Sequence, residues 1–325
     1  MTLSGNKVRK VKSSWQEYLF AKNFSLTYLK NKKMLNDTVW FTEISNGKFR
    51  INSRAIYRNL SSEIVTKLAQ NLSVSEILDW IKNETIKAFR EKYSQNPQVG
   101  ALNKAIGGWN ELIATSLLSE IIFDLNKETG MCIAAFSMPN SKLQLEGIDE
   151  AYSNFLNLFT KDSFANVNNS LSKTQPFKDK IFMPSPDYII VVIENEVIVP
   201  RINSLLQQQA INPDSLVLYN FLKGKLHIEE VKAAVSLKTS NRPDRRYQPL
   251  FEAAMIKAIA YVLQRSWKYY MVVSELTPAD RRIFSTAIAP HSVALEQTFH
   301  LVDGTYPYTR KADLVPLVAA AIEHY

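Results

Sequence analysis

The sequence predicts an α/β protein in which a central mixed β-sheet is flanked by helices. Three apolar runs are typical of strands, 188–193, 231–237 and 267–273, and a short strand is also expected at 299–302. Helical periodicity occurs before and between them, at 101–125 and 248–264. Strands that alternate with helices favour a layered α/β domain.

The composition is that of an ordinary globular protein with excess positive charge. Its 325 residues can bury a sizeable core, since 46% are hydrophobic. Thirty-nine Lys and Arg against thirty-one Asp and Glu give a net charge of +8, which suits a polyanionic partner. The single cysteine, Cys132, excludes an internal disulfide framework, and we expect it to be a small core residue. No apolar run suits a signal peptide or a membrane span, so we expect a soluble, cytoplasmic protein.

Residues 1–100 are expected to form a basic, mainly helical N-terminal region, and residues 101–325 a catalytic domain. Helix starts are predicted at Ser61 and Ser73, where a serine is followed by a glutamate in the first turn. The basic residues of 1–60 are interleaved with aromatic ones. They indicate either a solvated face or contact with DNA phosphates. We expect the region to serve DNA contact or dimerisation.

The helix expected at 101–125 contains a glutamate in an apolar setting. Gly107-Gly108 interrupts the pattern, so the secure part of the helix begins near Trp109. Glu111 would be costly to bury on the inner face of this helix unless it met a cation or a metal. Glu120 lies about 180° away in projection at 100° per residue, so the two glutamates do not share a face.

Charged residues mark the ends of the two most apolar strands. Asp187 opens the first, Lys238 ends the second, and thirteen residues separate Lys238 from Glu252 on the next helix. If the strands are antiparallel neighbours, Asp187 and Lys238 meet, and a loop plus about one helical turn returns Glu252 to the same edge. Carboxylates without His or Cys favour Mg²⁺, which can activate water against a phosphodiester. Spacing alone is also consistent with three residues that never meet.

The loop between that strand and helix, 239–247, is crowded with charge. Arg242 and Arg245 lie at a helix start, where cations oppose the helix dipole. Arginine forms bidentate bonds to guanine, and a carboxylate such as Asp244 accepts from N4 of cytosine. The cluster therefore suits the reading of adjacent C·G pairs. The alternative is a local salt-bridge cluster on a surface turn.

At these positions the sequence resembles type II restriction endonucleases of the PD-(D/E)XK superfamily. Within it, the sequence is similar to the CCGG-recognising branch, the group that includes SgrAI, NgoMIV and AgeI. The resemblance is carried by Pro186-Asp187, by Ser236-Leu237-Lys238 with Glu252, and by Arg242-Pro-Asp244-Arg245-Arg246. The common pattern has an acidic residue two positions before the lysine, where this chain has Ser236. That departure is typical of the branch, in which the helix supplies the carboxylate.

The resemblance implies a role for each of these residues. Asp187 and Glu252 would bind Mg²⁺, and Lys238 would be catalytic. The branch also has a glutamate on an earlier helix near the metal, for which Glu111 is the candidate and Glu120 the alternative. The loop residues would bind DNA: Arg242, Asp244 and Arg245 at base edges, and Arg246 at a base or a phosphate.

The implied activity is Mg²⁺-dependent hydrolysis of double-stranded DNA at a palindromic site with a CCGG core. Cleavage would leave 5′-phosphate ends and 5′ overhangs. A palindrome requires two active sites related by a twofold axis, so we expect a homodimer on DNA, or a tetramer. We also expect a prokaryotic host with a cognate DNA methyltransferase, and action at the nucleoid.

Three alternatives remain open on the sequence. The same class of enzyme could read a split CC-N-GG site. A non-catalytic DNA-binding protein could use the same basic loop, and would bind specifically without metal or cleavage. A repair phosphodiesterase or structure-specific nuclease would cut without a fixed site.

Overall fold

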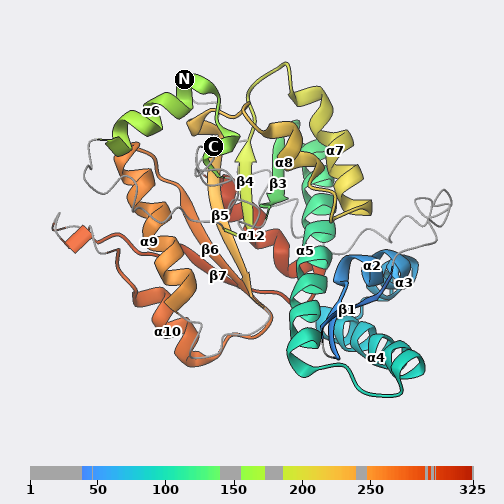
Figure 1. Ribbon diagram of the computed structural model, residues 1–325. Helices are drawn as coiled ribbons and strands as arrows, with labels where there is room; N and C mark the ends of the chain where they lie inside the picture. Colours follow the sequence, from blue (N-terminus) through green and yellow to red (C-terminus); the bar gives the residue numbers. More distant parts are fainter. Residues whose placement is uncertain are drawn as a thin grey trace. The chain divides into compact units, whose positions relative to one another are not determined.

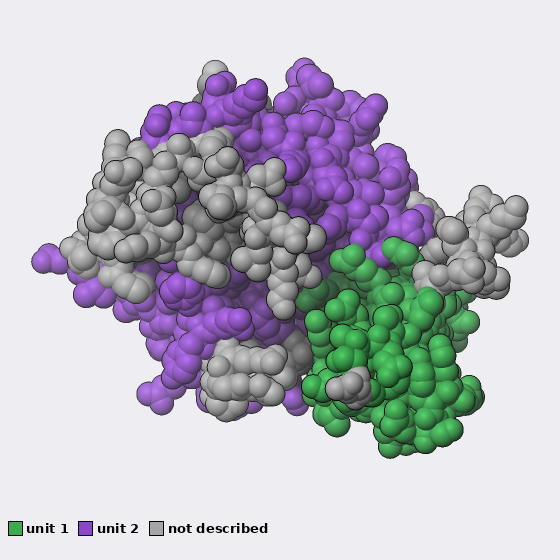
Figure 2. All heavy atoms as spheres, in the orientation of Figure 1, with its two compact units in different colours: residues 1–114, 309–312 green, residues 115–308, 313–325 purple. Residues whose placement is uncertain are grey.

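The computed structural model describes most of the chain, and it divides the chain into two compact units (Figure 2). The described residues are 39–45, 47–139, 155–172, 186–238, 247–289, 292–293, 296 and 298–323. One unit comprises Met1–Ala114 with Thr309–Ala312, and the other comprises Thr115–Tyr308 with Asp313–Tyr325. The division falls within one helix, α5 (Val99–Thr129). The sequence-based boundary at residue 100 lies at the start of that helix.

The second unit is built on a five-stranded mixed sheet, as the sequence predicted (Figure 1). Its strand order is β3-β4-β5-β6-β7, with antiparallel pairing from β3 to β5 and parallel pairing from β5 to β7. All five residues of β4 are buried, because helices cover both faces of the sheet. The strands are β3 (Ile133–Ser137), β4 (Tyr188–Val192), β5 (Val231–Lys238), β6 (Lys268–Val273) and β7 (Gly304–Pro307).

Helices α9 (Tyr247–Val262) and α12 (Val315–Ile322) contact opposite faces of this sheet (Figure 1). Successive residues of a strand point to opposite faces. On β6, the hydroxyl of Tyr269 donates to Glu252 of α9, whereas that of Tyr270 donates to the carbonyl of Ala320 in α12. The described part of the unit also contains the end of α5, from Thr115, and the helices α6 (Lys161–Ser172), α7 (Val199–Ile211), α8 (Val217–Leu222) and α10 (Pro278–Thr286). It has 3-10 turns at Leu156–Leu158 and Ile228–Glu230, and a third, Lys311–Leu314, lies partly within it.

Two strands differ from the sequence-based expectation. The strand β3 was not predicted, because it is a short run between a helix and a polar stretch. The short strand expected at 299–302 is wrong. There, His300 forms only an isolated bridge with Ile288, and the strand at that edge is β7, a few residues later. Its Gly-Thr-Tyr-Pro sequence lacks the alternation that marks a half-buried strand.

The first unit contains a β-hairpin followed by helices. Strands β1 (Phe41–Ser45) and β2 (Lys48–Ile51) pair antiparallel around Gly47, whose φ of 72° is in the left-handed region. Phe41 and Phe49 of the hairpin pack edge-on against Phe89. The helices are α2 (Ser53–Asn59), α3 (Ser61–Ala69) and α4 (Val74–Tyr93), which agrees with the mainly helical region expected here. Most of the basic N-terminal segment, residues 1–38, lies outside the described residues.

Two predicted local features have clear outcomes. Ser73 caps α4 through a reciprocal capping box with Glu76, as its sequence predicts. Cys132 is half-buried and free. Burial, and to a smaller extent the charge of Glu230, raises the pKa of its thiol to about 11.

In the part of the chain that the structure describes, no helix is long and apolar enough to cross a membrane.

The expected break at Gly107-Gly108 is wrong, because α5 runs through both glycines. A Cβ on Gly108 would lie 2.7 Å from the Ser53 hydroxyl oxygen and 3.1 Å from the Ser53 Cβ. Gly108 therefore allows the start of α2 to approach α5, and the indole of Trp109 donates to the Ser53 carbonyl at 3.1 Å. At Gly107 nothing lies within 4 Å of the same position.

These two glycines give a matched pair of substitutions. Gly107→Ala should raise the free energy of unfolding by about 1 kcal/mol, because alanine favours a helix interior and meets no neighbour. Gly108→Ala brings the same helix propensity but collides with Ser53, so it should lower stability. Chemical denaturation measures both, and equal gains from the two variants would contradict the close approach.

Candidate active site

Strand pairing brings Asp187, Ser236 and Lys238 to one edge of the sheet. Tyr188 pairs with Val235 in antiparallel register, so Asp187, one residue earlier, lies beside Ser236. Alternate residues of a strand share a face, which places Lys238 on the same face as Ser236. The start of β4 and the end of β5 therefore meet, as the sequence predicted for antiparallel neighbours.

Asp187 accepts three hydrogen bonds on one oxygen. Its Oδ2 atom lies 2.9 Å from the ammonium nitrogen of Lys238 and 2.6 Å from the backbone nitrogen of Leu237. The Ser236 hydroxyl donates to the same oxygen at 3.3 Å. The side chains of Asp187 and Lys238 are 22% and 30% exposed, so the ion pair lies at the boundary between core and solvent. These bonds fix the carboxylate while part of it stays accessible.

Glu252 is linked to the sheet by a buried tyrosine. Tyr269 is fully buried, and its hydroxyl donates to Glu252 Oε2 at 2.7 Å. Ser236 lies next to Tyr269 on the same face of the sheet. Burial, followed by the charge of Glu252, raises the pKa of Tyr269 well above its ordinary value. The phenol therefore stays protonated and donates to the carboxylate.

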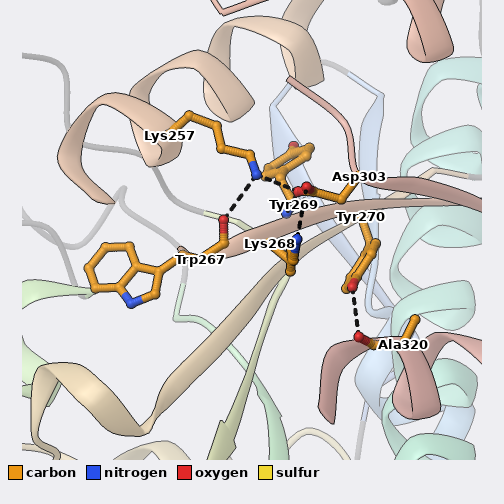
Figure 3. Close-up of polar contacts among 7 residues, drawn as sticks. All are labelled: Lys257, Trp267, Lys268, Tyr269, Tyr270, Asp303 and Ala320. Carbon is orange, nitrogen blue, oxygen red and sulfur yellow. Dashed lines mark hydrogen bonds and ion pairs between the residues drawn. The ribbon is translucent and has the colours of Figure 1, made fainter. Parts of the chain in front are cut away.

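The helix that carries Glu252 is held against β6 by an ionic cluster (Figure 3). Lys257 of α9 contacts Asp303 Oδ2 at 2.5 Å and the Trp267 carbonyl at 3.0 Å. Asp303 also accepts from the backbone nitrogen of Tyr269 at 2.7 Å, and the Lys268 ammonium lies 3.6 Å from its other oxygen. Burial lowers the pKa of Lys257, and the charge of Asp303 opposes that shift. The cluster restrains α9 against β6, the strand that carries Tyr269.

Other predicted site residues are not placed with this group. Arg242, Asp244, Arg245 and Arg246 lie outside the described residues, since 239–246 are not described. Glu111 is exposed and so is not buried on an inner, apolar face, and its role at the metal stays a prediction. The apolar residues Trp109 and Leu112 are buried and gave the stretch its apolar character, but one helix position can still point outward.

Sequence reasoning missed Tyr269. Its run, Trp267 to Val273, is predicted as a strand, but no motif marks the tyrosine. The parallel pairing of β5 with β6 sets Ser236 opposite Met271, so Tyr269, two residues earlier, shares the face of Ser236. That pairing is the signal that would have identified Tyr269.

Comparison with known proteins decides the family. The Cfr10I/Bse634I restriction endonuclease family matches residues 35–324. The chain belongs to this family. The type II restriction enzyme Cfr10I of Citrobacter freundii is 27% identical over 263 residues, which cover 76% of this chain and 85% of that enzyme.

Solved structures of restriction endonuclease Bse634I have the same fold. The crystal structure of the type IIF enzyme with cognate DNA has a TM-score of 0.66 and 21% identity, and covers 89% of this chain and 100% of that one. A second Bse634I structure has the same TM-score and identity, and covers 99% of its own chain. Membership of this family confirms the predictions that the chain has a restriction-endonuclease fold and is a hydrolase. The narrower similarity to the CCGG-recognising branch stays a prediction.

Family membership implies dependence on a divalent metal, and the donor atoms of this site fit one. Asp187 supplies carboxylate oxygens from the start of β4, and Glu252 supplies them from α9, which packs on the same face of the sheet. In the described ranges, no group of three His, Cys, Asp or Glu side chains could hold a metal ion. Mg²⁺ needs only one or two carboxylates when substrate phosphate and water complete its shell.

Proposed function

We propose that the protein is a Mg²⁺-dependent type II endonuclease that cleaves double-stranded DNA at a palindromic site with a CCGG core. The observation that carries the proposal is the contact of Lys238 with Asp187 at 2.9 Å, on the sheet face to which Tyr269 ties Glu252. Two carboxylates and a lysine at one half-exposed edge are the groups that metal-assisted phosphodiester hydrolysis requires.

Asp187 and Glu252 would hold the metal ion. A bound Mg²⁺ supplies charge stabilisation at the phosphate and lowers the pKa of water. Lys238, positioned by Asp187, would as an ammonium orient the attacking water or stabilise charge on the phosphate, or as the neutral amine accept a proton from that water. Water attacks phosphorus in line, leaving a 5′-phosphate and a 3′-hydroxyl. Glu111 is the candidate for a third carboxylate, with Glu120 as the alternative.

The CCGG core is proposed from the chemistry of Arg242, Asp244 and Arg245. Arg246 is assigned to phosphate. The resemblance supports cleavage before the core and 5′ overhangs, and a split CC-N-GG site is the alternative within the same class. A homodimer, or a tetramer, would place two active sites on a palindrome. A cognate methyltransferase would protect the same site in the prokaryotic cytoplasm.

Substitutions at the active site should separate cleavage from binding. Lys238→Ala and Glu252→Gln should each lower the cleavage rate by roughly 10²–10⁴-fold, because the first removes the group that acts on the water or phosphate and the second removes a carboxylate that holds the metal. Specific binding to a CCGG duplex should remain. Gel-based cleavage and fluorescence-anisotropy binding measure the two effects.

Matched controls are Lys223→Ala and Glu196→Gln, which change exposed residues away from the site. Both should cut like the wild type. Full activity in Lys238→Ala or Glu252→Gln would reject the assignment. A wild-type protein that binds CCGG but cuts no DNA with Mg²⁺ would favour the non-catalytic binding protein.

Asp244→Ala should remove about 1–3 kcal/mol of discrimination at one C·G pair, because its carboxylate is assigned to N4 of cytosine. Arg246→Ala is the matched control, and should weaken binding to all sequences alike and reduce the salt dependence of binding. Competition binding against single-base variants of the site measures both. If Asp244→Ala also weakened all sequences equally, the residue would be structural.

A further inference from the structure

The hydroxyl of the buried Tyr269 lies between β6 and the Glu252 carboxylate of α9. It donates to Glu252 Oε2 at 2.7 Å, and Ser236 lies beside it on the same face of the sheet. The Ser236 hydroxyl in turn lies 3.3 Å from Asp187 Oδ2. The Tyr269 and Ser236 hydroxyls therefore lie on the same face as the two carboxylates to which we assign the metal, and each donates to one of them.

The composition of β5 explains why Glu252 needs a hydrogen-bond partner on the sheet. Ser236 lies two residues before Lys238 and is fully buried. Because its side chain is a hydroxyl, β5 supplies no carboxylate at this position. The second carboxylate is instead that of Glu252 on α9, and its side chain must be directed toward the end of β5. A glutamate has several rotatable bonds, so an unrestrained Glu252 would lose conformational entropy on binding a metal.

We propose that Tyr269 is a positioning residue, whose hydroxyl fixes Glu252 in the orientation that binds the divalent ion. This inference rests on the proposed function of Glu252. Tyr269 itself does not contact the substrate. It acts through the carboxylate, as the hydrogen-bond partners of metal ligands generally do.

The surroundings of Tyr269 suit this role. Its ring is fully buried and its backbone nitrogen is held by Asp303 at 2.7 Å, so the hydroxyl has little freedom to move (Figure 3). Asp303 also binds Lys257, five residues after Glu252 on α9. The helix is thus tied to β6 at two points, one at Glu252 and one at Lys257. Both connections involve Tyr269: its hydroxyl bonds to Glu252, and its backbone nitrogen bonds to Asp303, which binds Lys257.

The neighbouring Tyr270 provides the matched control. It too is buried on β6, and its hydroxyl donates to the Ala320 carbonyl at 3.0 Å, but on the other face of the sheet (Figure 3). Removing either hydroxyl deletes one buried hydrogen bond and keeps the ring. A general loss of packing would affect both variants alike, whereas a role in metal binding affects only Tyr269.

The test is Mn²⁺ binding to the full-length protein, measured from the electron paramagnetic resonance signal of the free ion. Tyr269→Phe should weaken Mn²⁺ binding by about 10- to 100-fold. Tyr270→Phe should bind like the wild type. In cleavage assays, Tyr269→Phe should need more Mg²⁺ for half-maximal rate and recover most of its rate at saturating Mg²⁺. Specific binding to a CCGG duplex should not change.

A double-mutant cycle excludes a purely structural effect. Glu252→Ala should weaken the same Mn²⁺ site more than Tyr269→Phe does, and the double variant should bind Mn²⁺ as weakly as Glu252→Ala alone. Thermal unfolding checks that each variant folds. If Tyr269→Phe does not fold, Asp303→Asn loosens the anchor of the Tyr269 backbone and should weaken Mn²⁺ binding.

The outcomes separate the two proposals. Wild-type Mn²⁺ affinity in a folded Tyr269→Phe, with the site weakened in Glu252→Ala, would overturn the role of Tyr269 and leave the metal site intact. Mn²⁺ binding that Glu252→Ala does not weaken would overturn the metal site, and the role of Tyr269 with it.

Discussion

The antiparallel register of β4 and β5 is the constraint on which the site depends. Because side chains alternate between faces, a slip of one residue would turn Asp187 away from Ser236 and Lys238. Burial on both faces opposes such a slip, since every residue of β4 lies in the core. The packing that stabilises the sheet therefore also sets the distance between the carboxylate and the lysine.

The position of the ion pair at the sheet edge reconciles charge with burial. A fully buried Asp187 and Lys238 would incur a large desolvation cost, and a fully exposed pair would contribute little and stay mobile. At 22% and 30% exposure, the pair is ordered by Leu237 and Ser236 yet accessible to a substrate. The same compromise applies to Glu252, which α9 presents at the surface of the core.

The sequence predicted the parts of the site that depend on strong local patterns. The apolar runs before Lys238 and after Asp187 marked two buried strands, and their antiparallel pairing made the two residues meet. Tyr269 could not be predicted in this way, because its role depends on which strand pairs with β5 and in which register. Similarly, the glycines of α5 suggested a break, since their sequence does not reveal that Ser53 packs against Gly108. The sequence did not reveal that Glu111 is exposed, because apolar neighbours alone do not fix the direction of a helical side chain.

The central claim is that this edge of the sheet is a metal-dependent, site-specific nuclease centre. Digestion of a sequenced plasmid with the purified protein and Mg²⁺, with an EDTA control, tests it most directly once the cut ends are sequenced. The account predicts discrete fragments whose ends share a CCGG core, and an intact plasmid when EDTA is present. An intact plasmid with folded protein and Mg²⁺, or a smear without a common end sequence, would contradict it.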